Sequence, residues 1–196
     1  MKKLIIAFRY FKYKIFSRFY HLGWKVIFEK NVILRGAKYM KIGNHVNFDA
    51  NSVIYVVKHP KYDTKKPRLI IEDEVGIGIG AVILTVNSIH IKKCAMIGPH
   101  TVIADYDHRY QDANVSIKNQ GLINIKPVII EEGAWIGANV TVCSGVTIGK
   151  NSVIGANSVV KSDIPDYSVA VGIPASVIKK YDPQKGKWVK VRRKCN

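Results

Sequence analysis

Residues 128–160 read VIIEEGAWIGANVTVCSGVTIGKNSVIGANSVV and repeat with a period of six residues. The recurring aliphatic positions are Ile130, Ile136, Val142, Ile148, Ile154 and Val160. A small or β-branched residue follows the first five of them by four places, namely Ala134, Val140, Val146, Ser152 and Ser158. A period of six fits neither an amphipathic helix nor an alternating strand. It is typical of a solenoid, in which each hexapeptide supplies one short strand and one corner.

The residue types of the repeat agree with such a coil. We expect the aliphatic side chain to point inward and to stack on its equivalent in the next coil, with the small residue beside a corner. Gly137, Gly149 and Gly155 directly follow three of the aliphatic positions. Glycine there, or asparagine near the corner, is predicted to supply a positive φ. Ordinary buried strands would not explain a register that holds over the whole stretch.

The same register recurs upstream with two long interruptions. Its aliphatic or aromatic positions are Ile42, Phe48, Ile54, Ile71, Ile77, Ile83, Ile91, Ile97 and Ile103, with a slip of two residues at 86–89. Residues 57–68 contain two prolines and five basic residues, so they are predicted to form an exposed loop. Residues 104–127 read ADYDHRYQDANVSIKNQGLINIKP and have no hexapeptide register. A long loop in a compact solenoid usually has a function, so we place the chemistry there.

The overall composition indicates one domain with a large excess of positive charge. The chain has 196 residues and a net charge of +17, which favours anionic partners such as phosphates or a phospholipid surface. Cys94, Cys143 and Cys195 show no metal-binding spacing, and we expect free thiols in a reducing compartment. The apolar run that follows Met1 is too short for a signal peptide or a membrane span, so we expect a cytoplasmic protein.

Residues 2–20 are basic and aromatic, and they have the spacing of an amphipathic helix. Its predicted apolar face consists of Leu4, Phe8, Phe11, Ile15 and Phe19. One interpretation is an interfacial helix on an anionic membrane. The other is a helix that packs on the first coil and closes the solenoid. The two can hold together.

The repeat resembles the hexapeptide-repeat acyltransferase superfamily, whose members fold as left-handed parallel β-helices. Residues 135–160 and the following DIPDYSVAVGIPASVIKK are similar to the galactoside, maltose and xenobiotic O-acetyltransferase branch, and residues 105–108, DYDH, to polysaccharide and O-antigen O-acetyltransferases. The resemblance covers residues 42–180. It implies a mainly β fold in three parts: a basic aromatic helix within 1–30, a β-helix over 31–165 with an active-site loop at 104–127, and a C-terminal extension with a basic tail over 166–196.

The resemblance also implies an activity. The expected reaction is acetyl-CoA-dependent O-acetylation of a sugar hydroxyl in surface polysaccharide biosynthesis, by direct transfer and without a metal. The expected partners are a sugar or glycan acceptor, with a lipid-linked acceptor and peripheral contact with the inner membrane face as options, and two further copies in a homotrimer. Nucleic acid is not an expected partner.

His108 is the candidate general base, because family members place such a histidine in a loop before the terminal coils. A sugar hydroxyl is a poor nucleophile until its proton is removed, and histidine is the side chain that ordinarily titrates near neutral pH. Asp107 or Asp105 could fix the imidazole tautomer, although solvated loop aspartates are an equal alternative. The candidates for acceptor binding lie beside the histidine in the sequence and are Tyr106, Arg109 and Tyr110.

The resemblance further implies a coenzyme A site between adjacent subunits, against the last coils. The matching positions are Trp135, Gly137, Ala138, Ala156, Lys161, Ser162 and Lys179. Alanines would allow close approach and offer backbone amides, and lysines would meet phosphates. The chain departs from the family pattern at Lys161-Ser162, where Thr-Lys is usual, and at Asn157, where glycine is usual. Trp135 either lines the groove or covers the coil exterior.

Three alternatives remain open. The first is N-acetylation of an amino sugar. The second is a metal-dependent lyase of the γ-carbonic-anhydrase type, for which His90, His100 and His108 are the clustered candidates, although their spacing does not match that family. The third is a non-catalytic protein that binds membrane or nucleic acid through its positive charge.

Overall fold

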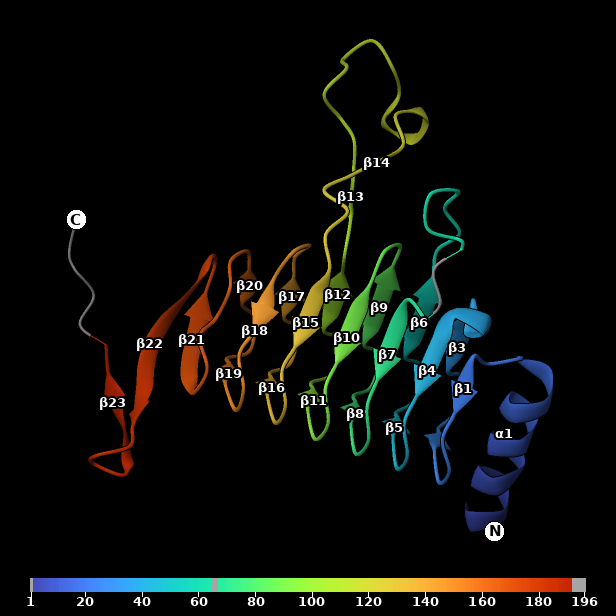
Figure 1. Ribbon diagram of the computed structural model, residues 1–196, viewed down its shortest axis with the longest axis horizontal. Helices are drawn as coiled ribbons and strands as arrows, with labels where there is room; N and C mark the ends of the chain where they lie inside the picture. The colour runs from blue at the N-terminus through green and yellow to red at the C-terminus, as the bar shows by residue number, and fades with distance from the viewer. Residues whose placement is uncertain (1, 65–66, 192–196) are drawn as a thin grey trace.

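The computed structural model describes residues 2–64 and 67–191 and shows a parallel β-helix (Figure 1). Its coils are stacked from the helix α1 (Lys2–Phe16) at one end to a hairpin of β22 (Ala175–Asp182) and β23 (Lys187–Lys190) at the other. The predicted fold class, a mainly β solenoid of hexapeptide repeats with an N-terminal helix and a short C-terminal extension, is confirmed. In the described part of the chain, no helix has the length and apolar character needed to cross a membrane.

Three sheets form the walls of the solenoid, and each coil contributes one strand to each sheet. Sheet A contains β1 (His21–Leu22), β4 (Met40–Ile42), β7 (Leu69–Ile71), β10 (Ile89–Ile91), β15 (Val128–Ile130) and β18 (Thr147–Ile148). Sheet B contains β2 (Ile27–Phe28), β5 (Asn47–Phe48), β8 (Gly76–Ile77), β11 (Met96–Ile97), β16 (Trp135–Ile136), β19 (Val153–Ile154), β21 (Ser168–Gly172), β22 and β23. Sheet C contains β3 (Ile33–Arg35), β6 (Val53–Val56), β9 (Val82–Thr85), β12 (Val102–Ala104), β17 (Thr141–Val142) and β20 (Val159–Val160).

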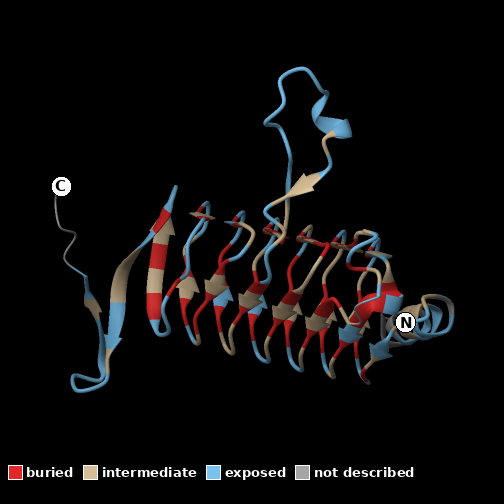
Figure 2. Ribbon diagram, turned by 45° about the horizontal axis from the view of Figure 1, so that its top comes forward, coloured by how far each residue is buried: buried red, intermediate tan, exposed pale blue. Residues whose placement is uncertain are grey.

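The core consists of columns of aliphatic side chains that run along the solenoid axis. In sheet A, the parallel register places one isoleucine of each of five successive coils beside the next, and all of them are fully buried: Ile42, Ile71, Ile91, Ile130 and Ile148. Figure 2 shows this buried interior continuing from coil to coil. Because every coil buries only one layer, its stability depends on contact with its neighbours.

The glycines of the repeat have a different role from the predicted one. Gly137, Gly149 and Gly155 do not have a positive φ, so that prediction is wrong. Coils instead approach too closely there for a side chain: a Cβ on Gly137 would lie 2.8 Å from the backbone nitrogen of Ala156. The prediction that asparagine near a corner has a positive φ is confirmed, because Asn139 has a φ of 54°.

The first interruption of the repeat, residues 57–68, is anchored to the core and not fully exposed as predicted. Arg68 is completely buried, and its Nη1 donates to the carbonyls of Val57 at 3.0 Å and Val86 at 2.8 Å. The guanidinium lies 4.1 Å from the ring centroid of Tyr39. Burial lowers the pKa of Arg68, while Asp63 opposes the shift. Lys65 and Lys66 of this loop lie outside the described residues.

The N-terminal segment differs from the prediction in extent and in orientation. The strands β1 and β2 already belong to the β-helix, so the coils start before residue 31. Helix α1 packs on the first coil through tyrosines, not through the predicted apolar face: the Tyr10 hydroxyl donates to the Gly23 carbonyl at 3.0 Å, and the Tyr13 hydroxyl donates to the Val32 carbonyl. Of the predicted face, Phe19 contacts the core, whereas the remaining members are exposed, namely Leu4, Phe8, Phe11 and Ile15.

The C-terminal extension begins as another strand of the solenoid. Strand β21 pairs in parallel with β19, and the chain then turns back through β22 and β23 as an antiparallel addition to sheet B. The predicted basic tail includes Arg192, Arg193 and Lys194, which lie outside the described residues, as does Cys195. Cys94 and Cys143 are free thiols.

Candidate active-site loop

The second interruption forms a projecting loop with a two-stranded stem. The chain leaves sheet C after Ala104 and re-enters sheet A at Val128. Between them, β13 (Asp107–His108) pairs antiparallel with β14 (Leu122–Ile123), and a 3-10 turn, η2 (Ile117–Asn119), lies beyond the stem. Figures 1 and 2 show the loop standing away from the solenoid with an exposed tip. His108 therefore sits on a hydrogen-bonded stem.

Gln120 organises the outer part of the loop. Its side-chain amide donates to the carbonyls of Asp112 at 2.8 Å and Val115 at 2.7 Å. Its carbonyl oxygen accepts from the backbone nitrogen of Asp112 at 3.1 Å, and the backbone nitrogen of Arg109 donates to the Gly121 carbonyl at 3.0 Å. The exposed segment thus has its own internal hydrogen bonds.

His108 is exposed and has an aromatic neighbour. The rings of Tyr106 and His108 meet edge to face, with centroids 6.2 Å apart. Tyr106 is partly buried, and that burial, together with the nearby Asp105 and Tyr55, raises the pKa of its hydroxyl. The Tyr106 hydroxyl therefore stays protonated at neutral pH and can donate a hydrogen bond. Of the other predicted acceptor contacts, Arg109 and Tyr110 are exposed farther along the loop.

Asp105 is a completely buried carboxylate at the root of the loop. It accepts four hydrogen bonds, from Thr85 Oγ1 and from the backbone nitrogens of Val86, Asn87 and Ser88, at 2.7, 2.7, 2.8 and 2.7 Å. These donors belong to the turn where the repeat slips by two residues. The contacts assign Asp105 to joining that turn to the loop, and not to orienting His108.

Asp107 lies on the stem and is exposed. Its Oδ2 accepts from the side-chain amide of Asn124 at 3.1 Å, across the two strands of the stem. This contact supports the register that places Asp107 opposite Ile123. The predicted role in fixing the His108 tautomer remains a prediction.

Ser144 anchors the loop to the next coil, a role that no sequence pattern predicts. Its hydroxyl donates to the carbonyls of Asn124 and Asp105, the latter at 3.2 Å. The backbone nitrogen of Lys126 also donates to the Asp105 carbonyl, at 3.0 Å. The two ends of the loop are thereby held together.

Cys143 and Lys161 occupy the same corner, in successive coils. The parallel register pairs Val142 with Val160, and the backbone nitrogen of Cys143 donates to the Val160 carbonyl at 3.0 Å. Burial raises the pKa of the Cys143 thiol, Asp107 raises it further, and Lys161 opposes the shift. Because Ile103 pairs with Val142 and Val142 pairs with Val160, Lys161 lies on the same edge of sheet C as Ala104, where the His108 loop leaves the sheet, two coils away.

The other predicted coenzyme A contacts lie on different parts of the coil surface. Ala138 and Ala156 are exposed and lie one above the other at the corner between sheets B and C, where the backbone nitrogen of Asn157 donates to the Ala138 carbonyl at 3.0 Å. Gly137 is buried before that corner, and Trp135 is 49% exposed on sheet B. The two remaining positions are Ser162, which is exposed after Lys161, and Lys179, which lies on β22.

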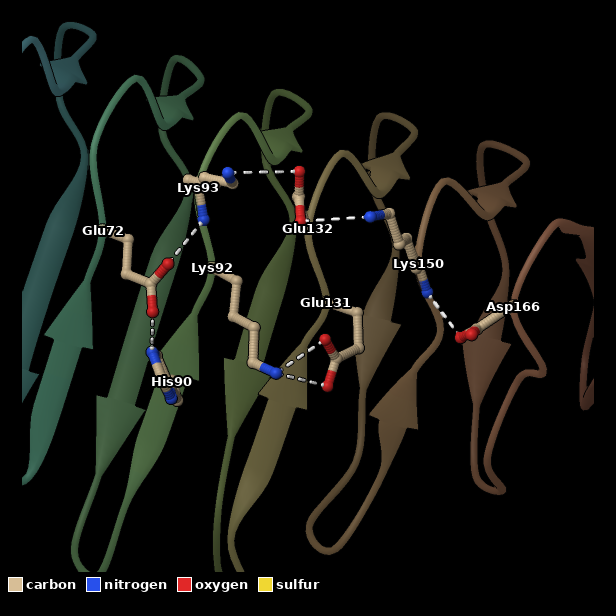
Figure 3. Close-up of polar contacts among 8 residues, drawn as sticks. All are labelled: Glu72, His90, Lys92, Lys93, Glu131, Glu132, Lys150 and Asp166. Atoms are coloured by element: carbon tan, nitrogen blue, oxygen red, sulfur yellow. Dashed lines mark hydrogen bonds and ion pairs between the residues drawn. The ribbon is translucent and has the colours of Figure 1, made fainter.

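His90, one of the three histidines of the lyase alternative, belongs to a ladder of polar contacts between coils (Figure 3). Its Nε2 lies 2.6 Å from Glu72 Oε1, on sheet A. Ion pairs continue the ladder between Lys92 and Glu131 at 2.7 Å, between Lys93 and Glu132 at 3.5 Å, and between Lys150 and Glu132 at 3.2 Å. The position of His90 favours a structural role.

The three histidines of the lyase alternative do not converge. His90 lies on sheet A, His100 lies at an exposed corner with a φ of 56°, and His108 lies on the stem. Within residues 2–64 and 67–191, no group of three histidine, cysteine, aspartate or glutamate residues is placed to hold a metal ion.

The family model that matches this chain covers part of its hexapeptide repeat. Residues 127–162 match the family model for the bacterial transferase hexapeptide (six repeats). The match lies within the hexapeptide repeats of the β-helix. Among curated relatives, this chain is 44% identical over 85 residues to galactoside O-acetyltransferase from Lactococcus lactis, covering 43% of this chain and 40% of the relative. It is 32% identical over 128 residues to WbbJ from Escherichia coli, which is named for O-acetyl transfer in lipopolysaccharide biosynthesis, covering 62% and 65%. Both matches span less than two thirds of the relative's length.

Solved structures share the fold of this hexapeptide-repeat protein. The acetyltransferase VCA0836 from Vibrio cholerae, complexed with acetyl coenzyme A, is 29% identical, with a TM-score of 0.58 over 89% of this chain and 76% of that chain. The N-acyltransferase AntD from Bacillus cereus, in complex with dTDP and coenzyme A, is 20% identical, with a TM-score of 0.73 over 90% and 91%. The predicted resemblance to hexapeptide-repeat acyltransferases is confirmed.

Proposed function

We propose that this protein transfers an acetyl group from acetyl-CoA to a hydroxyl of a sugar or glycan. The observation that carries the proposal is an exposed histidine, His108, on a hydrogen-bonded stem that leaves sheet C at the same edge as Lys161. A general base must be accessible to the acceptor and held in place, and the stem meets both requirements. The named activities of VCA0836, WbbJ and galactoside O-acetyltransferase support the same reaction class.

In the proposed mechanism, the transfer is direct. The His108 imidazole accepts the proton of the acceptor hydroxyl while the oxygen attacks the thioester carbonyl. The new C–O bond forms, and the C–S bond breaks as the tetrahedral intermediate collapses. The departing coenzyme A thiolate takes the proton from the imidazolium. A backbone N–H would stabilise the oxyanion, and the protonated Tyr106 hydroxyl would donate a hydrogen bond to the acceptor.

The proposed coenzyme A site follows sheet C from one corner to the other. Ala138 and Ala156 mark the corner where β17 and β20 begin, and Lys161 and Ser162 follow the end of β20. Gly137, Trp135 and Lys179 are assigned to the same extended site, with a second copy of the chain forming the opposite wall in a homotrimer. Lysine ammonium groups on this surface complement the phosphates of the cofactor.

An acceptor panel tests the proposed reaction. Thiol release from acetyl-CoA is expected with at least one free, nucleotide-linked or lipid-linked sugar, and mass spectrometry should find that acceptor heavier by one acetyl group. Hydroxylamine cleaves an ester product and leaves an amide intact. A resistant product would replace the proposal with N-acetylation of an amino sugar, an N-acyl transfer like the one for which AntD is named. No acetylated product with any acceptor would contradict acetyl transfer.

We further propose a cytoplasmic location and a lipid-linked acceptor in surface polysaccharide assembly. The positive charge of +17 and the match to WbbJ support this part of the proposal. Acetylation of a lipid-linked oligosaccharide, but not of the corresponding free oligosaccharide, would support it. Equal rates with both acceptors would remove the lipid requirement.

Thiol alkylation tests where coenzyme A binds. Cys143 is expected to react with N-ethylmaleimide more slowly than the exposed Cys94, because burial raises the pKa of the Cys143 thiol and leaves less of the reactive thiolate at neutral pH. Its rate should increase as the pH rises. Coenzyme A should slow Cys143 further and leave Cys94 unchanged, as measured by peptide mass spectrometry. A Cys143 rate that does not change with coenzyme A would contradict the site at Lys161.

A further inference from the structure

Helix α1 has an inner face that packs on the first coil and an outer face that is exposed. The inner face carries Tyr13, whose ring lies 4.5 Å from that of Phe28, and Arg9, which pairs with Glu29 at 3.4 Å. The outer face carries four large apolar side chains that are 56–78% exposed, namely Leu4, Phe8, Phe11 and Ile15. Such a stripe is costly to leave in water and indicates a partner.

The stripe is continuous and has a basic border. Successive residues of an α-helix are rotated by about 100°, so positions 4, 8, 11 and 15 fall on one line of the surface. The same rotation places Lys12 on one side of the stripe and Lys14 on the other, and both are exposed. Lysines in these positions can extend outward while the apolar side chains are buried.

The charged side chains of residues 2–28 are all basic. No acidic residue precedes Glu29, and Arg9 neutralises that carboxylate. The basic residues before it are Lys2, Lys3, Arg9, Lys12, Lys14, Arg18 and Lys25. The basic residues would not strengthen binding to a neutral apolar partner, but they would strengthen binding to an anionic surface.

The apolar surface extends from the helix to the first coil. A groove of about 640 Å³ lies between Phe11 on α1 and Val26 and Ile27 on the coil. Trp24 is 55% exposed near this groove, and the Lys25 ammonium lies 4.4 Å from its ring centroid. Tryptophan with adjacent lysine is typical of residues at a lipid headgroup boundary.

We propose that the outer face of α1 docks on an anionic lipid bilayer. The helix would lie in the interface plane, with Phe8, Phe11 and Ile15 among the acyl chains and Lys12 and Lys14 at the anionic headgroups. The inner face keeps the solenoid attached through Tyr10 and Tyr13. This docking places the solenoid at the membrane surface, and it does not depend on the proposed acetyl transfer.

Vesicle co-sedimentation of the full chain tests the docking surface. Binding is expected with phosphatidylcholine vesicles that contain phosphatidylglycerol and should be much weaker with phosphatidylcholine alone. Phe8→Ser together with Ile15→Ser should weaken binding about tenfold or more, because two apolar side chains no longer leave water. Lys12→Gln together with Lys14→Gln should weaken it by a similar factor and reduce its dependence on salt.

A matched control comes from the other end of the solenoid. Tyr181 and Trp188 are also exposed aromatics among lysines, on β22 and β23. Tyr181→Ser together with Trp188→Ser should leave vesicle binding unchanged, with circular dichroism confirming the fold of each variant. Three outcomes would overturn the proposal. They are loss of vesicle binding in this control alone, no binding by the wild type, and unchanged binding after the α1 substitutions. Dissociation of an oligomer by the Phe8 and Ile15 substitutions would also overturn it, since a second copy would then cover the face.

Discussion

His108→Ala is expected to lower the turnover of acetyl-CoA and acceptor at least a hundredfold. Positioned proton transfer contributes on the order of 10²–10⁴-fold, and the alanine variant lacks the imidazole that would accept the hydroxyl proton. Because His108 is exposed and contributes no core packing, the free energy of unfolding should be nearly unchanged. Initial rates of thiol release, with coenzyme A affinity measured by calorimetry, provide the comparison.

His45→Asn is the matched control for that substitution. His45 is an exposed corner histidine near the N-terminal end, with a φ of 56° that asparagine tolerates, and it is far from the loop in the sequence. Its turnover should equal that of the wild type. If His108→Ala retained full turnover with intact coenzyme A affinity, His108 would not be the base, and Asp107 would become the next residue to substitute.

Asp105→Asn is expected to lower the free energy of unfolding by about 3 kcal/mol, the largest stability effect predicted for this chain. The carboxylate accepts from Thr85 Oγ1 and from three consecutive backbone nitrogens in a site with no solvent exposure. An asparagine amide would turn two hydrogens toward donors that have no other acceptor. Urea denaturation followed by circular dichroism measures the change.

Asp107→Asn provides the comparison for Asp105→Asn, because it makes the same chemical change two residues along. Asp107 is exposed and accepts one side-chain hydrogen bond, from Asn124. Asp107→Asn should therefore change the free energy of unfolding of the protein by less than about 0.5 kcal/mol. Turnover should fall with Asp105→Asn even at temperatures where the variant is folded, since the root of the His108 stem is loosened. Equal stability of the two variants would contradict an anchoring role for Asp105.

The solenoid could be predicted from the sequence because its cause is local and repeated. Each hexapeptide buries one aliphatic side chain, and three hexapeptides make one coil, so the period predicts the parallel register that pairs Ile130 with Ile148, Ile136 with Ile154 and Val142 with Val160. The breaks in the period also identified the loop at residues 104–127 and its histidine. The family resemblance supplied the acyltransferase chemistry, which the period alone does not contain.

The roles of single residues depended on contacts that the period does not specify. Asp105 and the turn at 85–88 are separated by 17–20 residues in the chain, and only the stacking of coils brings the carboxylate to those donors. Ser144 reaches Asp105 across 39 residues for the same reason. Gly137 is needed because the backbone of the next coil passes within van der Waals distance, and not because of its own φ.

The amphipathic pattern of the N-terminus determined that a helix forms with an apolar stripe, and the tertiary structure decided where that stripe faces. Tyr10 and Tyr13 pack on the first coil because their rings contact its core and their hydroxyls satisfy carbonyl groups of that coil. Because the tyrosine face packs on the coil, the stripe of Leu4, Phe8 and Phe11 faces outward. Periodicity reports that a face is apolar, but the partner of that face is fixed by shape and hydrogen bonding in three dimensions.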